Sequence, residues 1–203
     1  MKKCHSKKGG FTYVELIVVL SIFAVMSSVI LFNYKGYQEK VDMRTLANQV
    51  ALRLVQAQKY AVGGKIPPRT TVTNWKPSYG VYFSTSTAPG NDADSKDFVF
   101  FTDLDNNKIY GNGSGNGSCS SGTGECLEKI SISRGSYVKG ISMDGTTPII
   151  DLYIIFTRPD SGAYFSSATG PISGTYAEIT LSSATGSTTS IIDVYPSGRI
   201  QLK

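Results

Sequence analysis

The sequence predicts an α+β fold in which one long N-terminal helix, membrane-spanning in its first half, packs on an antiparallel β-rich head. Three observations lead to this prediction. Residues 16–32 form an uncharged apolar run, interrupted only by serines. An amphipathic pattern without proline then continues to Val62. From Arg69 onward, short β-prone runs alternate with Gly, Ser, Asn and Pro, and no second helical pattern appears.

The charge of the chain is concentrated at its start. The 203 residues carry a formal charge of +5 with pI near 9.0, which by itself suggests an anionic partner. Four basic residues, however, precede the apolar run: Lys2, Lys3, Lys7 and Lys8. Without them 16 basic residues face 15 acidic ones, a formal charge of +1. Net charge therefore gives no support to a nucleic-acid partner.

The apolar run is long enough to cross a membrane when residues 11–14 are added to it. The lysines before it place the start of the chain on the cytoplasmic side and the remainder on the exported side. An ordinary secretory signal has its small residues after the apolar region. Here Gly9 and Gly10 come before it, so cleavage at that point leaves the apolar segment on the mature chain.

Glu15 is the anomaly of this segment. A carboxylate near bilayer depth costs several kcal/mol unless it is paired, which makes it a functional candidate. The structural alternative is a side chain that lies at headgroup level.

Residues 7–16, KKGGFTYVEL, resemble the class III signal of type IV pilins and type II secretion pseudopilins. The resemblance implies that prepilin peptidase cleaves between Gly10 and Phe11 and that Phe11 becomes N-methylated. It also implies that Glu15 pairs with the amino terminus of a neighbouring subunit. Such a pair would relieve two buried charges and set the axial stagger between subunits. The chain then divides into a leader (1–10), a filament-core helix (11–33), a stem helix (34–62) and a head (63–203).

The stem has apolar residues at three- and four-residue steps: Tyr37, Val41, Met43, Ala47, Val50, Leu54, Ala57 and Ala61. Gly63-Gly64 followed by Pro67-Pro68 predicts the helix end. The basic residues of 35–59 are interleaved with Glu39 and Asp42, so we interpret them as a solvated face rather than a nucleic-acid helix.

The head contains nine candidate strands, and residues 196–198 form a hairpin turn between the last two. We expect a sandwich or curled sheets that cover the helix, with strands at 69–73, 79–84, 97–102, 127–133, 137–141, 149–157, 176–181, 190–195 and 199–202. The head is similar to H-type minor pseudopilins and related minor type IV pilins at residues 57–61, 79–83, 100–103 and 192–200.

Asp103, Asp105 and Asn107 alternate like the first half of a calcium loop. The sixth position lacks Gly and the twelfth is Ser114 rather than Glu. A hairpin turn built from Asp and Asn explains the same residues.

Cys119 and Cys126 flank a short Gly/Ser-rich loop and, on the exported side, predict a disulfide. Removal of the leader also removes His5, the single histidine of the sequence. Two thiols without a histidine are too few ligands for a metal site, and neither thiol has an imidazole base to make it a nucleophile. Asp92, Asp94 and Asp97 lie in a Gly/Asn/Ser loop typical of solvated surface. We expect no enzyme activity and no cofactor.

A basic patch is the remaining candidate for a site. Some related minor pilins take up DNA and resemble this chain at Gly198-Arg199. Arg199 and Lys203 are therefore candidate DNA contacts, and Arg134, Lys139 and Arg158 are candidate members of the same basic patch. The second arginine expected two residues later is Gln201, which counts against this interpretation.

The sequence therefore predicts a structural minor subunit of a type II secretion pseudopilus or type IV pilus. It would sit in the bacterial inner membrane as a single-pass protein, with its head exported, before entering the filament. The implied partners are other pilin subunits, prepilin peptidase and the inner-membrane assembly platform. The alternatives are a competence-type minor pilin that binds DNA and a membrane-anchored exported binding domain or enzyme that never polymerises.

Overall fold

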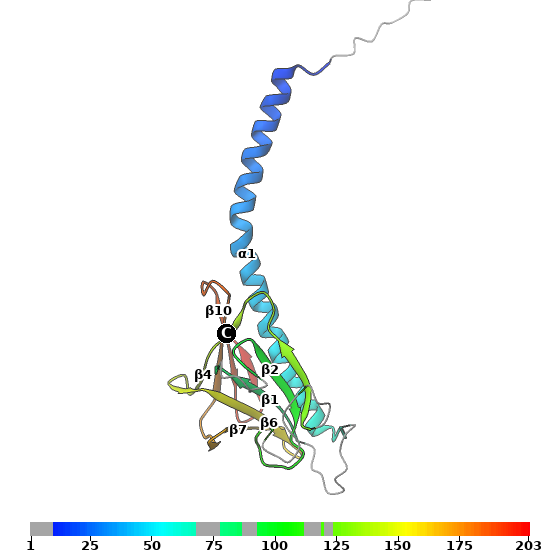
Figure 1. Cartoon of the computed structure of the whole chain (residues 1–203), viewed down its shortest axis with the longest axis vertical. Coiled ribbons are helices and arrows are strands. Elements are labelled where there is room, and N and C mark those ends of the chain that lie inside the picture. The colour runs from blue at the N-terminus through cyan, green and yellow to red at the C-terminus, as the bar shows by residue number, and fades with distance from the viewer. Residues whose placement is uncertain (1–9, 68–77, 87–92, 112–118, 120–123) are drawn as a thin grey trace, which may run out of the picture. The chain divides into compact units, whose positions relative to one another are not determined.

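The computed structural model describes residues 10–67, 78–86, 93–111, 119 and 124–203. Within them the fold is α+β, with helix α1 (Tyr13–Val62) and eleven strands (Figure 1). The chain divides into two compact units, Met1–Lys40 and Val41–Lys203. The first described residues, 10–12, precede the helix.

The described part of the first unit is dominated by the apolar turns of α1. Its window Tyr13–Ile30 has a mean hydropathy of 2.3, and none of it is buried. By length and composition this segment can cross a membrane, as membrane anchors and signal sequences both can. The apolar helix predicted near the N-terminus is therefore present.

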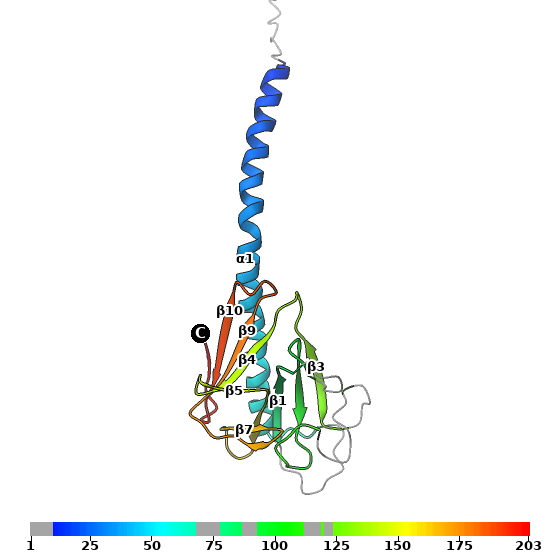
Figure 2. The ribbon, with the colours of Figure 1, turned by 60° about the vertical axis from the view of Figure 1, so that its left-hand side comes forward.

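In the second unit all strand pairs are antiparallel and form two sheets. One has the order β3-β2-β1-β6-β7-β8 and the other β11-β10-β9-β4-β5. Figure 2 shows β4, β9 and β10 next to the cyan turns of α1, and β1 and β3 in the other sheet. The strands are β1 (Ser78–Ser84), β2 (Asp97–Thr102), β3 (Cys126–Ser131), β4 (Tyr137–Met143), β5 (Thr147–Ile149), β6 (Asp151–Thr157), β7 (Ala163–Ser167), β8 (Gly170–Pro171), β9 (Ala177–Ser182), β10 (Thr189–Val194) and β11 (Ile200–Leu202).

The main core lies between the last turns of α1 and both sheets. Val50, Leu54, Ala57 and Ala61 are fully buried there, as the three- and four-residue spacing predicts. Within the second unit the pattern fails at its first residue, because the Val41 side chain is 39 % exposed. The predicted packing of the helix on the head is therefore confirmed for the stem from Met43 onward.

A smaller aromatic cluster covers the other face of the sheet that contains β1. Its members are Tyr82, Ala93, Val99, Phe101, Tyr110, Cys126, Tyr153 and Ile155. Every residue of β1 is buried, since α1 lies on one face of that strand and this cluster on the other. Gly80 is required in β1, because a Cβ there would lie 2.7 Å from the Phe101 ring.

Helix α1 ends at the predicted glycines in a Schellman motif. The Lys65 N–H donates to the Tyr60 carbonyl at 3.0 Å and the Gly64 N–H to the Ala61 carbonyl at 3.1 Å. Gly64 takes the left-handed φ of 63° that this cap requires. The cap turns the chain back, so that Lys65 lies beside the last turns of the helix.

Most predicted strands are present, with shifts of one or two residues at their ends. The predicted strand 149–157 is present as β6, which begins two residues later because the chain breaks at Ile150, whose side chain is 66 % exposed; residue 149 instead ends β5. The short strands β7 and β8 were not predicted. The predicted strand 69–73 lies outside the described residues. The hairpin turn at 196–198 is confirmed, with the Gly198 N–H donating to the Tyr195 carbonyl at 2.8 Å.

Candidate functional site

The start of α1 carries the motif on which the pilin resemblance depends. Thr12 Oγ1 accepts the Glu15 N–H at 3.2 Å, and Glu15 Oε2 accepts the Thr12 N–H at 3.4 Å. This reciprocal pair is a capping box, which satisfies two N–H groups that would otherwise lack a helical partner. The Glu15 carboxylate thus lies at the positive end of the helix dipole. Sequence reasoning missed this local role, although the Thr-x-x-Glu spacing signals it.

The predicted cleavage position lies just outside the helix. Gly10 is exposed with no atom within 4 Å of a Cβ built on it, and the Phe11 side chain is 82 % exposed. The structure therefore places Gly10 and Phe11 in non-helical, exposed backbone immediately before the Thr12 cap.

The predicted calcium residues are brought together only in part. Carboxylate oxygens of Asp103, Asp105 and Glu125 all lie within 4.8 Å of one another. Asn107 serves the turn instead, because its Oδ1 accepts the Ile109 N–H at 2.7 Å. Asp105 Oδ1 in turn accepts the Asn107 N–H at 3.1 Å. These are the bonds of a turn built from Asp and Asn.

A cation of the chain itself lies beside this acidic cluster. The Lys108 ammonium donates to Asp103 Oδ2 at 3.1 Å and to Thr157 Oγ1 at 3.1 Å. It also reaches Ser78 Oγ and Asn106 Oδ1, both at 3.3 Å. Asn106 and Lys108 take left-handed φ values of 61° and 64°, which direct the loop so that the ammonium meets Asp103. Lys108 thus supplies a positive charge to Asp103, one of the three carboxylates of the cluster.

Glu125 holds the same loop from the other side and was not predicted. Its Oε1 accepts the Leu104 N–H and its Oε2 the Gly111 N–H, both at 2.9 Å. Burial raises the pKa of Glu125 to about 7, against the lowering effect of these two bonds. Burial also raises the pKa of Asp103, although the Lys108 ammonium opposes it. The cluster therefore contains one carboxyl group, that of Glu125, whose protonation changes near neutral pH.

The predicted partners Cys119 and Cys126 lie at disulfide-bonding distance, with Cα atoms 5.1 Å apart. Cys126 is buried at the start of β3 and belongs to the smaller aromatic cluster. The Tyr110 hydroxyl lies 3.6 Å from Cys119 Sγ. The disulfide therefore links Cys119 to Cys126 in the smaller aromatic cluster, which also contains Tyr110.

The candidate DNA contacts are exposed and already have partners. The Arg199 guanidinium lies 3.9 Å from the centre of the Tyr195 ring. The Lys203 ammonium forms an ion pair with the buried carboxylate of Asp193. Arg134, a further member of the predicted basic patch, forms an ion pair with Asp42 of α1. Arg199 and Lys203, on either side of β11, thus contact side chains of the head.

The carboxylates set aside as solvated surface also take part in local structure. Asp94 Oδ1 accepts the Lys96 N–H at 2.6 Å, and Asp97 forms an ion pair with Lys129 at 3.0 Å. Asp92 lies outside the described residues.

No protein-family model matches the chain, and no curated protein or solved structure matches it.

Proposed function

We propose that this chain is a minor subunit of a type II secretion pseudopilus or a type IV pilus, with a structural rather than catalytic role. The observation that carries the proposal is the string at residues 7–16, in which basic residues, Gly-Phe and Glu precede an uncharged apolar helix. The exposure of that helix, from Tyr13 to Ile30, supports the proposal. So much apolar surface requires lipid or neighbouring helices to cover it.

Processing by prepilin peptidase would release residues 1–10 and leave Phe11 as the N-methylated terminus. Two features support this step. Gly10 and Phe11 precede the Thr12 cap, so cleavage breaks no helical turn. The leader that is lost contains the four lysines that orient the chain in the inner membrane.

Assembly would then depend on Glu15. In the filament, or in the membrane before extraction, its carboxylate would be surrounded by apolar helices, where an unpaired charge costs several kcal/mol. The new amino terminus of a neighbouring Phe11 is a cation of the right kind to neutralise it. Pairing of this type fixes the register between subunits because both charges must meet at one depth.

The remainder of the chain fits an exported head. Its two antiparallel sheets pack around the last turns of the helix, and the Cys119–Cys126 pair suits an oxidising compartment. The implied partners are other pilin subunits and the assembly platform in the inner membrane.

Substitution of Glu15 by Ala tests the proposal in cells that carry the chain's own secretion or pilus machinery. We expect the Glu15→Ala chain to be processed and to remain in the membrane, but to be lost from the sheared filament fraction by tenfold or more. Glu39→Ala, on the same helix, is the matched control and should leave filament entry unchanged. Equal amounts of Glu15→Ala and unsubstituted chain in filaments would contradict the proposed role of Glu15.

A further inference from the structure

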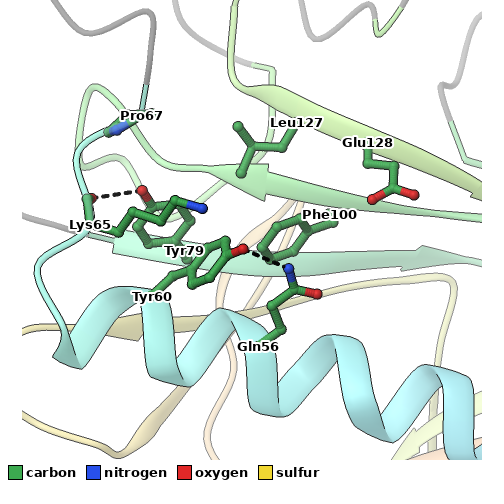
Figure 3. Close-up of a pocket in the computed structure, with 8 residues that line it drawn as sticks. All are labelled: Gln56, Tyr60, Lys65, Pro67, Tyr79, Phe100, Leu127 and Glu128. Carbon is green, nitrogen blue, oxygen red and sulfur yellow. Dashed lines mark hydrogen bonds between the residues drawn. The ribbon is translucent and has the colours of Figure 1, made fainter.

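A small cavity of about 190 Å³ lies between the last turns of α1 and strands β1, β2 and β3 (Figure 3). None of the residues that support the proposed function line it. Its apolar wall consists chiefly of Tyr60, Phe100 and Leu127, and its polar groups come from Gln56, Lys65 and Glu128.

The apolar wall is built from packed aromatic rings. The Tyr60 ring lies 5.8 Å from Phe100 and 5.5 Å, edge to face, from Tyr79. Phe100 and Tyr79 are almost fully buried, and the Tyr79 hydroxyl donates to the Lys65 carbonyl at 2.7 Å. These contacts fix the orientation of the half-buried Tyr60 ring, which presents a flat carbon surface to the cavity.

The polar groups are both donors and acceptors and lie around that surface. Gln56 Nε2 donates to the Tyr60 hydroxyl at 2.9 Å. The Lys65 ammonium lies 3.6 Å from the centre of the Tyr60 ring. Glu128 Oε1 accepts from Arg53 Nη2 at 2.8 Å. The rim therefore carries charges of both signs together with an amide and a phenol.

This combination selects a class of ligand. A purely apolar group would desolvate the rim without satisfying it. An anion would meet Glu128, and a cation would meet Lys65 and a Glu128 carboxylate that is already paired with Arg53. A neutral ring with one C–H face and several hydroxyls can stack on Tyr60 and exchange hydrogen bonds with the mixed rim. The cavity is smaller than the roughly 300–1,000 Å³ of sites for drug-sized ligands, so it accommodates one such ring.

We propose that this cavity binds a single neutral sugar unit, with its C–H face on Tyr60 and its hydroxyls bonded to Gln56, Lys65 and Glu128. Lys65 is exposed, and its ammonium can move from the ring face to a hydroxyl because its stem is flexible. A hexose has about 12 non-hydrogen atoms, which at ordinary ligand efficiency gives a dissociation constant of about 1–10 mM. Sugar binding does not depend on filament entry, since it is measured on the isolated full chain.

Saturation-transfer NMR of the full chain tests the proposal, in a detergent without a sugar headgroup. The probes are the methyl glycosides of glucose, galactose, mannose and N-acetylglucosamine, with benzoate and phenol as anionic and apolar comparisons. We expect at least one glycoside to bind in the range given above. Leu127→Trp, which fills the cavity, should weaken that binding tenfold or more. Leu52→Trp makes the same change at a 65 % exposed position of α1 and should leave it unchanged.

A second pair of variants keeps the test informative if Leu127→Trp does not fold. Tyr60→Phe removes the hydroxyl bonded to Gln56 and should weaken glycoside binding about threefold to tenfold. Tyr164→Phe, on β7 and outside the cavity lining, should not. The proposal is overturned if no glycoside binds, if phenol or benzoate binds more tightly than every glycoside, or if folded Leu127→Trp and Tyr60→Phe chains bind as before.

Discussion

The Glu15 carboxylate accepts the Thr12 N–H at 3.4 Å, so it stabilises the start of its own helix before any neighbour is present. A capping interaction contributes about 1 kcal/mol, whereas an unpaired carboxylate at bilayer depth costs several. In an apolar environment the cost of the unpaired charge therefore outweighs the gain from the cap. We infer that the cap organises the helix start and that the charge itself serves assembly in the proposed filament.

Two substitutions separate the cap from the charge. Glu15→Gln keeps the side-chain acceptor of the capping box but removes the negative charge. Thr12→Ala removes the hydroxyl of the cap and leaves the charge in place. We expect Glu15→Gln to be lost from the sheared filament fraction and Thr12→Ala to enter it nearly normally. The reverse outcome would assign the importance of Glu15 to helix capping.

Glu125 gives the head a dependence on pH. Its pKa of about 7 in the folded chain exceeds the ordinary value of 4.5, so the folded state retains a proton that the unfolded state releases. Its contribution is fully present below about pH 4.5 and is lost as the pH rises through about 7. The difference corresponds to about 3 kcal/mol. Asp103, whose pKa burial also raises, acts in the same direction.

Urea unfolding of the full chain in detergent, at about pH 5 and about pH 8, measures this effect. The free energy of unfolding should be lower at the higher pH, and Glu125→Gln should reduce the difference by most of its size. Glu128→Gln, at a 49 % exposed position of β3, is the control and should retain the difference. A pH dependence that survives Glu125→Gln would show that another group is responsible.

At the level of elements, the sequence predicted those features of α1 that depend on neighbouring residues in the chain. The spacing of apolar residues predicted the buried face of α1, and Gly63-Gly64 predicted its end. Strands β7 and β8 were missed because they are short and contain serines, Gly170 and Pro171. Their form depends on pairing, of β7 with β6 and of β8 with β7. The break at Ile150 was also hidden, because a continuous β-prone run gives no sign of where a strand ends.

The turn between β10 and β11 depends on the absence of a side chain at Gly198. Its φ is 82°, and a Cβ there would overlap the Ser161 carbonyl and the Gln58 amide. Gln58 Nε2 donates to the Gly198 carbonyl at 3.3 Å and to the Ser161 carbonyl at 2.7 Å, so α1 holds this turn in place. We expect Gly198→Ala to lower the free energy of unfolding by about 3 kcal/mol or more.

Gly186→Ala is the matched control for that substitution. Gly186 has a similar φ of 74° but open space around it, so alanine should cost only about 1 kcal/mol there. Urea unfolding of both variants separates the conformational cost from the overlap. Equal losses would contradict the role assigned to the Gln58 and Ser161 contacts.

For the molecule as a whole, the sequence showed the candidate motif but not the groups that tertiary contacts bring together. Glu125 joins Asp103 because β2 and β3 pair, with Phe101 opposite Cys126. The proposed sugar cavity combines residues of α1, of the loop after it and of three strands. No spacing in the sequence signals such combinations, because each depends on which strands become neighbours.

For the whole molecule, the formal charge of +5 does not indicate an anionic partner. It belongs mainly to residues 1–10, whose lysines would orient the chain in the membrane under the proposed function. The processed chain would carry about +1, so subunits packed in a filament would not repel one another strongly. Removal of the leader is therefore the event on which the proposed function most depends.

Mass spectrometry of the intact chain from its native membrane fraction tests this event directly. We expect a chain that begins at N-methylated Phe11 and lacks residues 1–10. A chain that retains Met1, or one cleaved after the apolar helix, would contradict the proposed processing and, with it, entry into a filament.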